Sequence, residues 1–263
     1  MLARSFLFVP GDRPERFAKA VAAGADVVII DLEDAVAPAH KAQARAAVDD
    51  WLRSGGQAWV RVNAADTAHY AEDLALLSTP GLLGVCLPKA GDGATLAQLA
   101  ERLPAGLMIL PIVESARGVW NAAEIAAAPR VLRLAFGSVD FQHDCGILGD
   151  GLELLYARSR LVLASAMAGI EPPVDGVTLD LNSQPALLAD VEQARQLGFA
   201  GKLCVHPKQV PGINQGFAPS AEERAWAERV VAAADAQPGV GAVSLDGRLI
   251  DAPVVLRARR MLG

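Results

Sequence analysis

Leu110-Pro-Ile-Val-Glu114-Ser115 is a short apolar run that stops at an acid, and it is the clearest architectural signal in the chain. The next such run repeats the arrangement as Leu134-Ala-Phe-Gly-Ser-Val-Asp140. Runs of this kind are typical of parallel strands, which are buried on both faces. In a barrel of parallel strands the C-terminal strand ends open onto one face, so Glu114 and Asp140 are predicted to point into a shared pocket.

Short apolar runs alternate with helical patterns along most of the chain, which is typical of βα units around a parallel sheet. A length of 263 residues also suits an eight-unit barrel. We therefore predict an α/β fold, a TIM (β/α)8 barrel. Its eight predicted strands are residues 6–9, 27–31, 58–63, 84–88, 108–113, 132–137, 176–179 and 202–206.

Helical patterns fill the intervals between these runs, and the pattern changes after residue 217. There a polar-faced helix, 221–236, precedes two short strands around the Asp246-Gly247 turn. We predict a barrel catalytic domain over residues 1–218. Residues 219–263 are predicted to form a C-terminal helix/hairpin extension that contacts a neighbouring subunit. The predicted barrel helices are residues 14–23, 40–53, 68–77, 95–103, 152–170 and 185–197.

Composition excludes several classes of partner. The chain has 24 basic and 30 acidic residues, a net charge of -6, and no basic block that could neutralise a run of phosphates, so no nucleic acid is expected. No run approaches the ~20 apolar residues that cross a bilayer, so no membrane is expected. Cys86, Cys145 and Cys204 are widely spaced and lack CxxC spacing, which indicates a reducing compartment. Without a signal-peptide pattern, the predicted localisation is cytoplasmic.

Glu114 and Asp140 are candidate ligands of Mg2+, which is usually held by one or two carboxylates together with waters and a substrate oxygen. The sequence therefore predicts a metal-assisted enzyme. It contains no GxGxxG after a strand, GxxxxGK[ST], HExxH or EF-hand pattern, so nucleotide, zinc and calcium sites lack support. A Ser/His/Asp hydrolase also lacks support, because no serine lies in a nucleophile-elbow pattern.

Asp31-Leu-Glu33-Asp34 places three acids at the end of the second predicted strand. Like charges held this close cannot all ionise without a nearby cation. The cluster is predicted to order metal-bound water, to pair with Arg61 or Lys89, or to move protons. Asp34 by itself is equally consistent with an N-terminal cap of the following helix.

Arg61 and Lys89 supply positive charge at two further strand ends. The planar guanidinium fork of Arg61 fits a substrate carboxylate, and its apolar neighbours argue against a solvated surface position. Lys89 could be a Schiff-base nucleophile or a charge partner. A nucleophilic lysine needs a depressed pKa, whereas several carboxylates are predicted at the same mouth, so an ion pair is favoured.

Taken in order, these and similar motifs resemble the citrate lyase beta subunit-like family across almost the whole chain. The wider HpcH/HpaI aldolase group contains malyl-CoA and citramalyl-CoA lyases. Its members are similar in being TIM barrels that bind Mg2+ and make or break a carbon–carbon bond between a thioester enolate and a small keto acid. The motifs are Phe6-Leu-Phe-Val-Pro-Gly-Asp-Arg-Pro14, Asp31-Leu-Glu-Asp-Ala-Val36, Arg61-Val-Asn63, Leu87-Pro-Lys89, Pro111-Ile-Val-Glu-Ser115, Gly137-Ser-Val-Asp140-Phe and Gly201-Lys-Leu-Cys-Val-His-Pro207.

The resemblance implies a role for each of the candidate residues. Glu114 and Asp140 would hold Mg2+. Glu114 and Lys89 would also bind the substrate. Arg61 would bind the substrate carboxylate or the thioester enolate. Glu33 and Asp34 would be acids around the metal waters.

Two implications concern the assembly. Asp251, in the tail Leu249-Ile-Asp251-Ala-Pro253, resembles an acid that reaches the active site of a neighbouring subunit, and Asp246 is a competing candidate. The family resemblance also implies a homotrimer or a hexamer.

The predicted function is Mg2+-dependent cleavage of a 3-hydroxy-3-carboxyacyl-CoA to acetyl-CoA and a small keto acid. Aldolases that act on free hydroxy-keto acids resemble one another in carrying a histidine after the Leu-Glu pair, whereas this chain has Asp34 at that position. The resemblance therefore favours the thioester branch and a substrate of the citramalyl-CoA, malyl-CoA or citryl-CoA type. The alternatives are a citryl-carrier-protein lyase subunit, which would take an acyl-carrier thioester, and an aldolase for free hydroxy-keto acids. An alternative of another class is a non-catalytic protein that binds CoA esters or metabolites.

Overall fold

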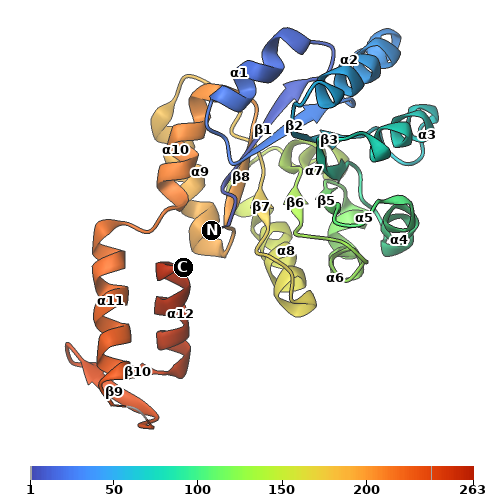
Figure 1. Cartoon of the computed structure of the whole chain (residues 1–263). Helices are drawn as coiled ribbons and strands as arrows, with labels where there is room; N and C mark the ends of the chain where they lie inside the picture. The colour runs from blue at the N-terminus through green and yellow to red at the C-terminus, as the bar shows by residue number, and fades with distance from the viewer. Residues whose placement is uncertain (1, 238) are drawn as a thin grey trace. The chain divides into compact units, whose positions relative to one another are not determined.

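A computed structural model describes residues 2–237 and 239–263, which form two compact units, Leu2–Phe217 and Ala218–Gly263. In the first unit eight parallel strands close into a barrel, with β8 paired to β1 (Figure 1). This confirms the predicted TIM (β/α)8 fold. The strands are β1 (Ser5–Pro10), β2 (Val27–Asp31), β3 (Ala58–Arg61), β4 (Leu82–Leu87), β5 (Met108–Val113), β6 (Ala135–Phe136), β7 (Val174–Asp175) and β8 (Gly201–Cys204).

Helices surround the barrel, and 3-10 turns begin or end several of them (Figure 1). The α-helices of this unit are α1 (Phe17–Ala22), α2 (Lys41–Arg53), α3 (Ala68–Asp73), α4 (Gly93–Arg102), α5 (Ala116–Trp120), α6 (Ala122–Ala126), α7 (Ser138–Cys145), α8 (Leu155–Ala168), α9 (Gln184–Leu197) and α10 (Val210–Phe217). The 3-10 helices are η1 (Pro14–Arg16), η2 (Pro38–His40), η3 (Leu74–Ser78), η4 (Leu152–Leu154) and η5 (Pro207–Gln209). None of the described helices is long and apolar enough to cross a membrane.

The barrel has two hydrophobic layers because successive strand residues point to opposite faces. One cluster, which we assign to the interior, takes side chains from all eight strands, Phe6, Ile29 and Leu203 among them. Their neighbours, such as Leu7 and Ile30, belong to a larger cluster with the helices. The interior is therefore a packed core, and a site can form only where the strands end.

The seventh predicted strand, 176–179, is wrong. β7 consists of Val174 and Asp175, and Val174 pairs with Ala135 of β6 and with Gly201 of β8. The apolar residues Val177 and Leu179 suggested a strand, but Leu179 is 68% exposed and lies in irregular chain. Residues 174 and 175 form the strand instead, because the Val174 side chain packs in the interior cluster.

The sixth strand is shorter than the predicted 132–137, and helix α7 follows it at once. α7 was not predicted. It begins at Ser138, so Asp140 lies in the first turn of a helix beyond the strand end. Gly146, which follows α7 with a φ of 67°, is the left-handed residue that commonly ends a helix.

The second unit contains α11 (Ala221–Asp235), β9 (Ala242–Leu245), β10 (Arg248–Asp251) and α12 (Ala252–Leu262). The predicted helix and hairpin are present, with Asp246 and Gly247 both at positive φ in the turn. α12 was not predicted. Val230, Val243 and Ala258 are buried in a small core that is separate from those of the barrel.

Candidate active site

A cavity of about 370 Å³ lies at the C-terminal ends of the strands. Its lining combines charged and apolar residues, so a ligand there would meet both polar groups and apolar surface. The charged lining residues are Asp31, Asp34, Arg61, Glu114 and Asp140. The apolar ones include Phe8, Ile112, Phe136, Val177, Leu203 and Val205.

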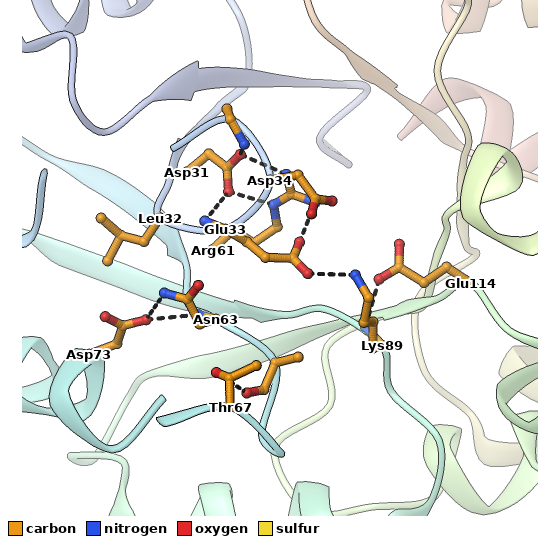
Figure 2. A network of polar contacts seen from close by, with 12 residues as sticks. Asp31, Leu32, Glu33, Asp34, Arg61, Asn63, Thr67, Asp73, Lys89 and Glu114 are labelled. Atoms are coloured by element: carbon orange, nitrogen blue, oxygen red, sulfur yellow. Dashed lines mark hydrogen bonds and ion pairs between the residues drawn. The ribbon is translucent and has the colours of Figure 1, made fainter. Parts of the chain in front are cut away.

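Arg61 ends β3 and lies between the acids of the β2 end (Figure 2). Its Nε and Nη2 donate to the two carboxylate oxygens of Asp31, both at 2.6 Å, and its Nη1 lies 2.9 Å from Glu33 Oε2. Burial lowers the pKa of Arg61, but the charge and hydrogen bonds of Asp31 outweigh it and raise the pKa overall. Arg61 is thus a fixed cation, with two N–H groups on Asp31 and Nη1 beside Glu33.

Asp31 holds the turn that follows β2. It is 1% exposed, and its carboxylate accepts backbone N–H groups of Glu33 and Ala35 as well as the Arg61 fork. Asp34 lies 3.8 Å from Arg61 Nη1 and is the more exposed acid. The interpretation of Asp34 as a helix cap is wrong, because neither η2 nor α2 has a side-chain cap hydrogen bond.

Glu33 links Arg61 to Lys89 (Figure 2). The predicted ion pair of Lys89 is present, with Lys89 Nζ donating to Glu33 Oε1 at 2.8 Å. Burial raises the pKa of Glu33, and the charges of Arg61 and Lys89 oppose this. Glu33 Oε2 is buried and accepts no hydrogen bond from the described residues. Arg61 Nη1, 2.9 Å from this oxygen, compensates its negative charge.

Glu114 follows β5 directly and is 4% exposed. Its Oε1 accepts the backbone N–H of Lys89 at 2.7 Å (Figure 2). Lys89 has a φ of 51°, which is left-handed and uncommon for a residue with a side chain. Burial raises the pKa of Glu114 to about 8, and the negative charges of Glu33 and Asp140 add to this effect. The site therefore concentrates negative charge that a cation would neutralise.

The donor set fits Mg2+. Glu114 and Asp140 line one cavity and influence each other electrostatically. Within residues 2–237 and 239–263, no group of three or more His, Cys, Asp or Glu side chains could hold a metal ion. Zinc sites usually have three or four such ligands, whereas Mg2+ is bound by one or two carboxylates and keeps several waters.

Residues 4–207, which include all of these barrel residues, match the family described as HpcH/HpaI aldolase/citrate lyase. The chain belongs to this family. It is 41% identical to a citrate lyase subunit beta-like protein of Deinococcus radiodurans, covering 99% of this chain and 96% of that protein. A (3S)-malyl-CoA thioesterase of Cereibacter sphaeroides is 33% identical, with 98% and 93% covered.

A crystal structure of CitE from Mycobacterium tuberculosis, in complex with magnesium, acetoacetate and coenzyme A, is also similar to this chain. The TM-score is 0.86 at 38% identity, and the match covers 99% of this chain and 97% of that one. The likeness therefore extends over the barrel and the C-terminal residues.

Asp251 and Asp246 lie in the C-terminal unit of this HpcH/HpaI family member. Asp251 caps α12, because its Oδ1 accepts the backbone N–H of Val254 at 3.3 Å. Asp246 pairs with Arg229 of α11 at 2.7 Å. Both acids thus have structural partners within their own unit, and the role of Asp251 in a neighbouring subunit stays a prediction.

Sequence reasoning missed part of the site of this family member. It did not single out Gly137, Ser138 or the apolar residues that line the cavity, such as Val177 and Val205. Val177 and Val205 were both placed inside predicted strands. Gly137 and Ser138 stand beside Asp140 in one motif, and that proximity was the available signal.

Proposed function

We propose that this protein is a Mg2+-dependent carbon–carbon lyase that cleaves a 3-hydroxy-3-carboxyacyl-CoA to acetyl-CoA and a small keto acid. The observation that carries the proposal is the pair Glu114 and Asp140, which line one cavity with the fixed cation Arg61. Family membership supports the lyase class. The CitE structure that contains magnesium, acetoacetate and coenzyme A supports the cofactor and the thioester.

In this proposal Glu114 and Asp140 hold the ion, which when bound would chelate the substrate hydroxyl and carboxylate and make the hydroxyl more acidic. We propose that the acids at the end of β2, Glu33 and Asp34, order water and that one of them accepts the hydroxyl proton. The pair of electrons released by breaking the carbon–carbon bond then forms the thioester enolate.

Arg61 is the group that meets the negative charge of the enolate. Its guanidinium is already held by Asp31, so little reorganisation is needed when charge develops. Lys89 keeps Glu33 in place through their ion pair, and we propose that it also contacts the substrate. The enolate carbon takes a proton to give acetyl-CoA, and we propose Asp251 of a neighbouring subunit as its donor.

The test is to incubate the protein with citramalyl-CoA, malyl-CoA and citryl-CoA, in Mg2+ or in excess EDTA, and to quantify acetyl-CoA, free CoA and keto acids by mass spectrometry. We expect acetyl-CoA and one keto acid in equal amounts, only with Mg2+. Glu114→Gln and Asp140→Asn should each abolish the product. Exposed Glu101→Gln on α4 is the matched control and should leave turnover unchanged.

Other products would identify the alternatives. Free CoA with an intact hydroxy acid would indicate thioester hydrolysis, the activity in the name of the Cereibacter relative. Keto acid released only from free hydroxy-keto acids would indicate an aldolase. Cleavage only of citryl-carrier protein would indicate a lyase subunit, and binding without any product would indicate a non-catalytic protein. Each of these results would overturn the proposal.

A further inference from the structure

The carboxylate of Glu114 occupies space that exists only because residue 137 has no side chain. A Cβ on Gly137 would lie 2.4 Å from both Cβ and Oε2 of Glu114, and 3.1 Å from Cγ2 of Ile112. Carbon atoms that are not bonded to each other approach to about 3.5 Å, so a methyl group here cannot coexist with the present Glu114 side chain.

The backbone at Gly137 does not itself require glycine. It has a φ of -87° and a ψ of 74°, and a negative φ does not exclude residues with side chains. Its N–H donates to Val113 O at 3.0 Å, and its carbonyl accepts the N–H of Phe141 at 3.0 Å. Alanine could form both bonds. Space beside Glu114 is therefore what the missing side chain provides.

Gly137 connects the two proposed metal ligands. Through Val113 it is bonded to the residue before Glu114, and through its carbonyl it begins the helix that carries Asp140. The other oxygen of Glu114, Oε1, is held by the Lys89 N–H. One carboxylate oxygen is thus fixed by a hydrogen bond, while the empty volume at Gly137 admits the other.

We infer that Gly137 is a positioning residue, whose missing side chain allows the Cβ and the carboxylate of Glu114 to occupy their present positions. This has two consequences. Gly137→Ala must displace the Glu114 side chain, which is a packing effect independent of any ligand. It must also weaken Mg2+ binding, and this second consequence rests on the proposed function.

The first consequence is tested by thermal unfolding in EDTA of the wild type, Gly137→Ala, Glu114→Gly and the double variant. Overpacking should lower Tm by about 3–10 °C when Gly137→Ala is made in the wild type. In the Glu114→Gly background the two atoms at 2.4 Å are gone and only Ile112 Cγ2 at 3.1 Å remains, so the shift should be less than half as large. Any effect of Gly137→Ala on the capping of α7 is the same in both backgrounds and cancels when the two Tm shifts are compared.

Gly216→Ala is the matched control. A Cβ there would lie 2.5 Å from Cγ1 of Val191, between α10 and α9, so it is similarly crowded but remote from Glu114. Its Tm shift should be the same in both backgrounds. Equal Tm shifts for Gly137→Ala in the two backgrounds would overturn the inference. If Gly137→Ala folds poorly in the wild-type background, the Glu114→Gly background still shows whether removal of the Glu114 side chain relieves the loss of stability.

The second consequence is tested by isothermal titration of MgCl2 into the folded variants. Gly137→Ala should weaken Mg2+ binding at least tenfold, while Gly216→Ala should not change it. Unchanged affinity in Gly137→Ala would contradict the positioning role. If the wild type itself binds no Mg2+, the proposed function fails, and the unfolding experiment still decides whether Gly137 positions Glu114.

Discussion

Arg61 shows how much at the site depends on single residues. It was predicted to bind a substrate carboxylate and to be a possible partner of the β2 acids, and its fork holds Asp31, which is 1% exposed, and approaches Glu33. Breaking a buried pair by removing one partner costs about 3–5 kcal/mol, because the other charge is left uncompensated. Arg61 therefore contributes to stability as well as to the proposed chemistry, and a test must separate the two.

Arg61→Lys and Arg61→Ala separate these contributions. Lysine keeps the charge but loses the fork, so it should retain most of the free energy of unfolding while lowering kcat by about 10²–10³. Alanine should lower both. Denaturant unfolding and single-substrate kinetics are the measurements. Full kcat in the lysine variant would mean that the guanidinium is not required.

At the scale of elements, the ends of neighbouring strands bring the site together, and an ion cluster fixes β7, one of the two shortest strands. β7 has only two residues, yet Asp175 is buried with Arg158 Nε at 3.0 Å and Lys202 Nζ at 3.3 Å. These partners come from α8 and β8. Such a cluster can hold a short strand in register where few backbone hydrogen bonds are available.

Removing different members of this cluster should have unequal effects. Asp175→Ala leaves two buried cations without their shared partner, and we expect a loss of about 3–5 kcal/mol in the free energy of unfolding. Lys202→Met should cost less, because Arg158 still neutralises Asp175 and the methionine fills the volume. Urea unfolding of the two variants checks the order. A larger loss for Lys202→Met would contradict this account.

At the scale of the whole molecule, the uncompensated acids at the mouth should make stability depend on pH. Burial raises the pKa of Glu114 from its ordinary 4.5 to about 8, so in the metal-free protein the folded state retains a proton that the unfolded state has lost. Between these pH values the folded state binds more protons, and its free energy of unfolding falls as pH rises.

We expect this fall to approach ~1.4 kcal/mol per pH unit between pH 5 and 8 in EDTA. Glu114→Gln, which imitates the protonated acid, should flatten the slope, whereas exposed Glu101→Gln should not. Urea unfolding at a series of pH values measures it. A Glu114→Gln profile parallel to that of the wild type would show that Glu114 titrates normally.

The assembly can be tested through the proposed role of Asp251 in a neighbouring subunit. Arg61→Lys and Asp251→Asn should each have strongly reduced activity alone. If an active site combines Arg61 of one subunit with Asp251 of another, dissociating and reassociating a mixture should restore up to about a quarter of wild-type sites. Activity assays of the mixture, together with light scattering for the predicted trimer or hexamer, give the result. Lack of recovery in mixed oligomers would place Asp251 outside the site.

By itself the sequence determined the α/β barrel, because eight apolar runs alternate with helical patterns. It also determined which charges gather at the mouth, since Glu33, Arg61, Lys89 and Glu114 all follow or end strands. These conclusions depend on local periodicity and on a topology that brings strand ends together. No contact between distant residues had to be known.

Only the tertiary structure decided how those residues are used. This holds for the two-residue strand β7, for helix α7, which contains Asp140, for the pairing of Arg61 with Asp31, and for the empty volume at Gly137. Each depends on contacts between residues far apart in the chain. A local pattern states that a residue is apolar, acidic or small, but not which neighbour it meets. Packing supplies the neighbour, and at this site the neighbour sets the orientation and charge of each carboxylate.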